Sequence, residues 1–275
     1  MAERSAYAKI NLTLEVGNKR EDGYHLLTSV MTRITLADRV TVNKNNSGKI
    51  NFTATDKSIP SEVNLCTKAA KLCLDALSVT GQGVDITLEN NIPTASGMGG
   101  GSADAASVIE CMEELFGTLD RDMRHGIALS IGADVPYCLE KTPCLCTGIG
   151  DICKPLKCKP LDGLWLVVSK VGEKLSTGKV YGDLDAMENR ESRNDHSLTV
   201  EALEKGDVYQ LSKSTFNDFE QVVFPASPEV ENEYERLLSM GAVKVTMSGA
   251  GPTLIAFFDD EEKAKACGNT YKIIT

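Results

Sequence analysis

The residues with the clearest chemical potential form a glycine-rich stretch, Pro93–Ala103, in which four glycines occupy the five positions 97–101. Missing side chains let consecutive backbone N–H groups wrap around an anion. We predict that a helix follows at once, so its unsatisfied N–H groups and positive dipole end face the same place. The stretch lacks the lysine of a Walker A loop, and Ser102 stands where a dinucleotide fingerprint has its third glycine.

A flexible turn is the alternative, but the order of glycine-rich loop, serine and helix favours phosphate binding. The candidate phosphate-binding residues are Pro93, Thr94, Ala95, Ser96, Gly97, Met98, Gly99, Gly100, Gly101, Ser102 and Ala103.

A second candidate is Asp134, which lies in the turn Gly132–Pro136. Gly132 ends a predicted helix and Pro136 restricts the residue before it, so the aspartate is held in a tight connection. A carboxylate held in this way is suited to act as a general base. The structural alternative is that Asp134 bonds its own backbone, as most aspartates in turns do.

Lys9 and Asn11 form a third candidate. Apolar and polar residues alternate over positions 6–16, and this period of two predicts a half-buried strand. Lys9 and Asn11 therefore point from the same face, opposite the core. A solvated sheet face is the structural alternative. Against it stands their position between Tyr7 and Thr13, on a face that other parts of the chain could cover.

Two further elements have a weaker signal. Tyr24 and His25 follow the polar turn 17–23 and offer an aromatic plane for stacking and a ring nitrogen for hydrogen bonding; a surface pair is an equally good interpretation. Ser248–Pro252 is a second loop of small residues, able to bring backbone N–H groups close to a ligand. The remaining histidines have no ligand partner at useful spacing, so we expect no metal site built from side chains.

The helices and strands that position these residues are predicted from the spacing of apolar residues and from the residues that begin or end an element. Asn64 is placed to cap a helix, and Ser102 or Asp104 stands where an N-cap or a first-turn acid belongs. We place a domain boundary after residue 153, which gives an N-terminal domain, 1–153, and a C-terminal domain, 154–275. We predict helices at 65–77, 102–116, 121–131, 230–240 and 261–271, strands at 6–16, 30–36, 40–42, 50–52, 84–88, 164–169, 243–247 and 253–258, and a polar surface excursion at 183–194.

Composition limits the function classes. The chain has 275 residues and a formal net charge of −10, and the acidic excess is shared by both halves. Nucleic-acid or anionic-membrane binding is therefore not expected, whereas a small anionic substrate needs only a local nest of donors. No apolar run approaches the roughly 20 residues of a membrane span. The N-terminus has no apolar signal region, so we expect a cytoplasmic protein, monomeric or homodimeric.

Nine cysteines raise a redox question. Their number is odd, and the five between Cys138 and Cys158 include no C-x-x-C pair of the kind that structural zinc sites favour. We expect buried free thiols in a reducing compartment rather than a metal cluster.

Taken together, these motifs resemble those of the GHMP kinases. The resemblance rests on Ala8–Leu12, Arg20–His25, Pro93–Ala106, Gly132–Pro136, Asn217–Glu220 and Ser248–Gly251, in order and over nearly the whole chain. It implies an α+β, two-domain GHMP kinase fold, with an N-terminal nucleotide domain like domain 2 of ribosomal protein S5, a ferredoxin-like C-terminal domain and an active site in the cleft. The Asp-Gly-Tyr-His element is typical of the branch that acts on a cytidine diphosphate derivative.

The resemblance also implies roles for individual residues. Asp134 would accept the proton of the substrate hydroxyl, and Lys9 would assist it and stabilise charge near the transferred phosphoryl group. The loop 93–103 would hold the phosphates of ATP, which would be used together with Mg²⁺. The substrate-binding residues would be Asn11, Tyr24, His25 and Tyr181. A kinase for another small alcohol and a catalytically silent relative are the alternatives.

Overall fold

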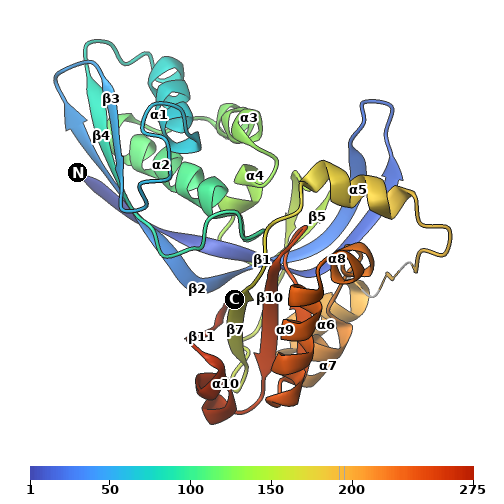
Figure 1. Ribbon diagram of the computed structural model, residues 1–275. Coiled ribbons are helices and arrows are strands. Elements are labelled where there is room, and N and C mark those ends of the chain that lie inside the picture. Colours follow the sequence, from blue (N-terminus) through green and yellow to red (C-terminus); the bar gives the residue numbers. More distant parts are fainter. Residues whose placement is uncertain (192, 195) are drawn as a thin grey trace. The chain divides into compact units, whose positions relative to one another are not determined.

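The computed structural model describes residues 1–191, 193–194 and 196–275 (Figure 1). The chain divides into two compact units. Unit 1 comprises residues 1–8, 36–94 and 99–141; unit 2 comprises residues 9–35, 95–98 and 142–275. The long strands β1 and β2 contribute residues to both units.

Short runs of strands are followed by short runs of helices along the chain, as expected for an α+β protein. The strands are β1 Ala2–Lys19, β2 His25–Asn45, β3 Ile50–Ala54, β4 Gly83–Glu89, β5 Cys144–Thr147, β6 Ile152–Pro155, β7 Trp165–Lys170, β8 Phe216–Asn217, β9 Lys244–Met247, β10 Thr253–Phe258, β11 Thr270–Tyr271 and β12 Ile273–Ile274. The helices are α1 Leu65–Ala76, α2 Gly100–Phe116, α3 Arg121–Ile131, α4 Val135–Cys138, α5 Thr177–Asp185, α6 His196–Lys205, α7 Val208–Ser214, α8 Glu220–Ala226, α9 Pro228–Ser239 and α10 Glu261–Cys267.

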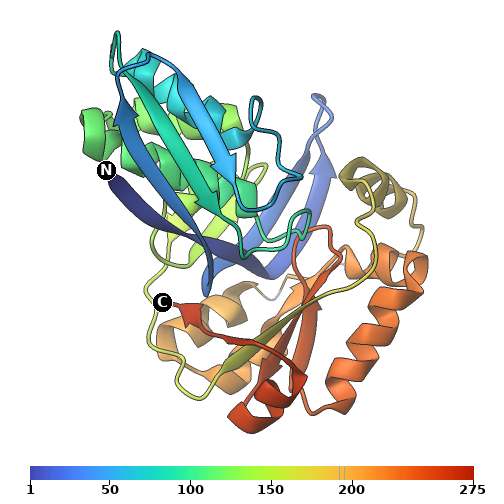
Figure 2. The ribbon, with the colours of Figure 1, turned by 60° about the vertical axis from the view of Figure 1, so that its left-hand side comes forward.

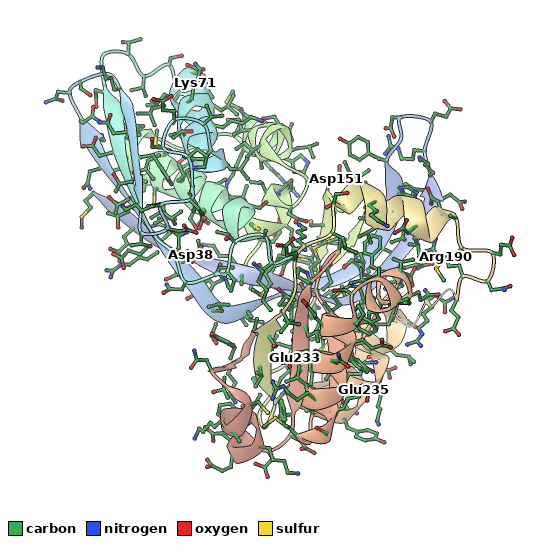
Figure 3. All side chains as sticks on the ribbon, viewed as in Figure 1. Asp38, Lys71, Asp151, Arg190, Glu233 and Glu235 are labelled. Carbon is green, nitrogen blue, oxygen red and sulfur yellow. The ribbon has the colours of Figure 1, made fainter. Side chains whose placement is uncertain are left out.

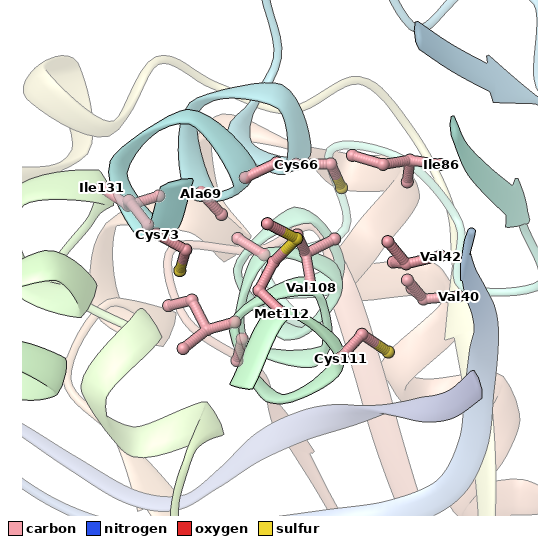
Figure 4. Close-up of a cluster of buried hydrophobic side chains, with 14 of the residues drawn as sticks. Val40, Val42, Cys66, Ala69, Cys73, Ile86, Val108, Cys111, Met112 and Ile131 are labelled. Carbon is pink, nitrogen blue, oxygen red and sulfur yellow. The ribbon is translucent and has the colours of Figure 1, made fainter. Parts of the chain in front are cut away.

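Unit 1 is a layer of helices packed on one face of a sheet (Figure 2). The strand order is β3-β4-β2-β1, with β4 parallel to β3 and antiparallel to β2. Figure 4 shows the core between the layers, where Val40, Val42 and Ile86 of the sheet face Val108 and Met112 of α2. The period-two spacing of Val40 and Val42 puts both side chains on the buried face, as the sequence pattern predicts.

Helices α1 and α2 of unit 1 have different kinds of N-cap. Asn64 caps α1 as predicted: its side chain accepts from the Thr67 N–H at 3.0 Å, and the Thr67 hydroxyl accepts from the Asn64 N–H at 3.2 Å. The predicted start of α2 is wrong, because its N-cap is Gly99 in the left-handed conformation, with φ 65°, and the helix begins at Gly100. Ser102 therefore lies inside the first turn.

Unit 2 contains a separate antiparallel sheet in the order β11-β7-β10-β9. Helices α9 and α10 pack against it (Figure 1), and Val245, Met247, Leu254 and Phe258 contribute to the core. In the same unit β1 pairs with β8, β2 pairs with β5 and β12, and β5 pairs with β6.

Three element predictions need correction. Residues 30–36 and 40–42 belong to one strand, β2, because Ala37–Arg39 contains no glycine or proline to interrupt it. The polar stretch 183–194 begins inside α5, whose buried residues are Val180 and Leu184. The predicted C-terminal helix ends at Cys267, before Gly268, and β11 follows it. Within the described residues no helix is long and apolar enough to span a membrane.

Candidate functional site

Lys9 and Asn11 lie buried on one face of β1, with side chains 4% and 1% exposed, so a solvated sheet face is not what the structure shows. The Lys9 ammonium Nζ donates to Asn11 Oδ1 at 3.0 Å. The same oxygen accepts from the backbone N–H of Gly249 at 3.1 Å. On the other side of the amide, Asn11 Nδ2 donates to Ser29 Oγ at 2.8 Å, and Ser29 Oγ donates to the carbonyl of Thr13 at 2.6 Å. These bonds fix both the position and the orientation of the amide.

The loop Ser248–Pro252 is anchored by Asn217 of β8. Asn217 Nδ2 donates to the carbonyl of Met247 at 2.7 Å and to that of Gly249 at 2.8 Å. The peptide groups of Gly249 are thus held by Asn11 on the N–H side and by Asn217 on the carbonyl side. The loop that the sequence ranked as a minor element is therefore part of the Lys9–Asn11 network.

The glycine-rich stretch meets this loop within unit 2. The backbone N–H of Lys9 donates to the carbonyl of Met98 at 3.0 Å. A Cβ added at Gly97 would lie 2.4 Å from the carbonyl oxygen of Ser248, and one added at Gly249 would lie 3.0 Å from the carbonyl of Gly97. Both glycines have positive φ, 76° and 57°. Glycine is required here because two backbones approach closely.

Gly97→Ala is expected to lower the free energy of unfolding by about 2–4 kcal/mol, because a positive φ and a backbone clash act together. Urea denaturation measures this change. Gly101→Ala is the matched control from the same stretch, since its Cβ would meet Leu65 Cδ1 at an ordinary 3.5 Å. Equal midpoints for the two variants would contradict the close approach.

Two buried aspartates flank the unit 1 part of the stretch: Asp38, labelled in Figure 3, and Asp104, which follows Ala103. Asp38 on β2 accepts from the backbone N–H groups of Asn91 and Ile92, the latter at 2.7 Å. Burial raises the pKa of Asp38, and burial together with the charge of Asp38 raises the pKa of Asp104 far above its usual value. The two carboxyl groups share a hydrogen bond. This pair ties the start of α2 to the residues that precede Pro93.

Asp134 is half-buried in unit 1, at the position before the first residue of α4. Its side chain makes no capping hydrogen bond to the start of that helix. The turn is closed by the backbone, through the Val135 N–H donating to the carbonyl of Gly132 at 3.1 Å. Gly132 ends α3, as predicted.

His25 and Tyr181 are brought together in unit 2, which the sequence alone did not show. Their rings stack with centroids 4.6 Å apart and an interplanar angle of 25°. The Phe219 ring packs edge-on against the Tyr181 ring, with centroids 4.8 Å apart. His25 Nε2 lies 2.8 Å from Asp185 Oδ1. An ionised carboxylate only accepts hydrogen bonds, so Nε2 carries a proton in this contact. Tyr24, in contrast, is 60% exposed on the turn between β1 and β2.

The sequence analysis missed Ser29 and Asp185, and it gave Asn217 no role. Asp185 had a usable signal, because it follows Tyr181 by four residues and so shares one helix face with it. Ser29 had none, since its place depends on the pairing of distant strands. Within the described residues no group of three or more His, Cys, Asp or Glu could hold a metal ion.

Comparison with known proteins places these residues in a family. Residues 64–141 match the model of the GHMP kinases N-terminal domain, and residues 199–272 match that of the GHMP kinases C-terminal domain. The chain belongs to the GHMP kinase family. The two-domain α+β GHMP kinase fold expected from the motifs is thereby confirmed.

Three GHMP kinase relatives are similar over nearly their full length. A protein of Clostridium perfringens named 4-diphosphocytidyl-2-C-methyl-D-erythritol kinase is 41% identical, over 93% of this chain and 88% of its own. A protein of the same name from Clostridium novyi is 40% identical, over 97% and 94%. A crystal structure of 4-(cytidine 5'-diphospho)-2C-methyl-D-erythritol kinase superposes with a TM-score of 0.83 at 30% identity, covering 99% of this chain and 98% of that one.

Proposed function

We propose that this chain is an ATP-dependent kinase that phosphorylates the 2-hydroxyl of 4-diphosphocytidyl-2-C-methyl-D-erythritol, a step in the non-mevalonate route to isoprenoid precursors. The observation that carries the proposal is the similarity to relatives of that name along almost the whole chain, at about 40% identity. The buried network around Lys9 and Asn11 supports it, because a buried ammonium costs stability and is retained where charge must be stabilised.

In the proposed reaction the substrate hydroxyl oxygen attacks the γ-phosphorus of ATP while the bond to ADP breaks. Asp134 accepts the hydroxyl proton as general base. Lys9 stabilises the negative charge on the phosphoryl oxygens as they pass from ATP to the substrate. The remaining contribution of the protein is positioning, which is most of the catalytic task in phosphoryl transfer.

The glycine-rich residues 93–103 hold the ATP phosphates in this proposal. Gly97 and Gly99 have positive φ, and the first turn of α2 supplies backbone N–H groups with no intrahelical partner. Mg²⁺ would neutralise phosphate charge when bound.

The cytidine end of the substrate is proposed to bind to His25, Tyr181 and Tyr24, with Asn11 facing the substrate nearer the reacting hydroxyl. The stacked rings of His25 and Tyr181 offer planes on which a base can pack, and the exposed ring of Tyr24 offers another. With its Nε2 proton held by Asp185, His25 leaves Nδ1 as an acceptor for the amino group of cytosine.

We propose an ATP-binding domain, 1–153, and a C-terminal domain, 154–275; the two family matches fall one in each. The partner is a small molecule, a cytidine diphosphate derivative, and not a nucleic acid. We further propose a cytoplasmic location and a monomeric or homodimeric state.

The test is ADP release from ATP and Mg²⁺ with the cytidine substrate, run beside mevalonate, homoserine and galactose. Turnover of the cytidine compound alone is expected. Turnover of a different alcohol would keep the kinase and overturn the substrate. Binding of ATP without turnover of any alcohol would favour a silent relative.

His25→Ala is expected to raise KM for the cytidine substrate about 10- to 100-fold, because it removes a stacking plane and a hydrogen bond worth about 1–3 kcal/mol together. The value of kcat should change little, since the residue lies at the base and not at the reacting hydroxyl. Steady-state kinetics with varied substrate measure both constants. His125→Ala, at an exposed position of α3, is the matched control. An unchanged KM in His25→Ala would remove His25 from base recognition.

A further inference from the structure

Two cysteines of the segment 138–158 lie directly opposite each other on paired strands. Cys146 of β5 is the register partner of Cys153 of β6 in an antiparallel pair, and their Sγ atoms are 3.3 Å apart. Opposed residues of an antiparallel pair have Cα atoms about 4.5–5.5 Å apart. A disulfide needs a Cα separation of about 4.4–6.8 Å, so the register of these two strands allows a cross-strand disulfide. Figure 3 marks the turn between the two strands by Asp151.

The two thiols are not equivalent. Cys146 is fully buried, whereas Cys153 is half-buried and accepts a hydrogen bond from the Cys146 thiol. That hydrogen bond, and then burial, raise the pKa of Cys146 far above its usual value. Cys153 is therefore the thiol that a small oxidant reaches and reacts with first, and Cys146 is the one that closes the bond.

The pair is connected to the Lys9–Asn11 network through β2. Cys146 is also the register partner of Ser29. Ser29 Oγ accepts the Asn11 amide at 2.8 Å, and Asn11 Oδ1 holds the Lys9 ammonium at 3.0 Å. The positive charge of Lys9 acts on Cys146 as well, where it opposes part of the rise in pKa.

We propose that Cys146 and Cys153 are a thiol modification site that takes small-molecule disulfides, and that the disulfide formed between them slows phosphoryl transfer. The Cys153 thiolate attacks one sulfur of the small disulfide, forms a mixed disulfide and expels a thiolate, which takes up the proton that Cys153 lost. Cys146 then loses its proton, attacks the sulfur of Cys153 and expels the second thiolate, which takes that proton. The two protein thiols are oxidised by two electrons, and one small disulfide is reduced to two thiols.

Closing the bond must displace the Cys146 side chain within its buried site. The sulfurs have to approach from 3.3 Å to about 2.05 Å, and the buried Cys146 side chain has little room to turn. The displacement is passed to the paired residue Ser29, and so to the amide of Asn11 that positions Lys9. A misplacement of about 1 Å at a reacting group is enough to lower a rate markedly.

The test treats the reduced protein with oxidised glutathione, blocks remaining thiols and maps disulfides by peptide mass spectrometry. A single bond, Cys146–Cys153, is expected, with the mass of the chain lowered by two hydrogen atoms. The kcat/KM should fall about tenfold and return with dithiothreitol. This second readout rests on the proposed kinase function, whereas the mapping needs no substrate. If the reduced protein showed no turnover, the proposed kinase function would be contradicted, whereas the disulfide mapping would still test the modification site.

Two variants sharpen the test. Cys153→Ser, at a half-buried position, should show unchanged activity when reduced and no loss with oxidised glutathione. Cys158→Ser removes a half-buried thiol outside the pair and should respond to oxidation as the parent protein does. A disulfide that joins other cysteines, or Cys146 and Cys153 recovered as separately blocked thiols, would overturn the site. A Cys146–Cys153 bond with unaltered activity would overturn its coupling to Lys9.

Discussion

Asp134→Asn is expected to lower kcat by about 100- to 10,000-fold while KM for both substrates changes little. Asparagine has nearly the shape of aspartate and keeps one carbonyl oxygen, but it does not accept the hydroxyl proton. In the proposed site, binding depends on residues outside this turn, namely the glycine-rich stretch and the aromatic residues of unit 2. The loss should therefore fall on the chemical step alone.

Steady-state ADP release gives kcat and KM, and a single-turnover measurement shows that the slow step is chemical. Asp134 does not cap α4, so the variant loses no helix cap, and a thermal melt should confirm that it is folded. Asp122→Asn, at an exposed position in the first turn of α3, is the matched control and should keep normal kcat. If Asp134→Asn retained normal kcat, the general base would have to be another group. A raised KM with unchanged kcat would indicate a binding role instead.

Local pattern was sufficient to predict several features of the candidate site. The period-two alternation placed Lys9 and Asn11 on one strand face, and the glycine composition of residues 97–101 marked a loop that a helix follows at once. Both signals lie within a few residues along the chain. The same is true of the N-cap Asn64, whose partner is only three residues away.

The hydrogen-bond partners of the site residues could not be predicted from local sequence pattern. Asn11 is bonded to Gly249, 238 positions later, and His25 to Asp185, 160 positions later. Such contacts arise from strand pairing and helix packing, which a periodic signal does not encode. The predicted start of α2 failed for a different reason. Serine is a preferred N-cap, but here Gly99 in a left-handed conformation takes that position three residues earlier than Ser102.

Lys9→Met is expected to lower kcat about 100- to 1,000-fold, because the reaction loses a fixed positive charge near the transferred phosphoryl group. Methionine matches the length of the lysine stem and fills the same buried space. A buried ammonium has a large desolvation cost, which its removal relieves, and the buried Asn11 Oδ1 keeps its hydrogen bond from the Gly249 N–H. The midpoint of urea unfolding should therefore stay the same or rise while kcat falls.

This opposite movement of stability and activity separates a catalytic lysine from a structural one. If Lys9 served mainly to hold Asn11 and the Gly249 loop in place, its removal would lower the unfolding midpoint together with kcat. Lys71→Met, at the exposed lysine of α1 that pairs with Asp75, is the matched control and should alter neither quantity by more than a small amount. Loss of stability and activity in parallel would contradict the catalytic role. A fall in kcat in a protein at least as stable as the parent would leave charge stabilisation as the explanation, since the fold would no longer depend on the ammonium that the reaction needs.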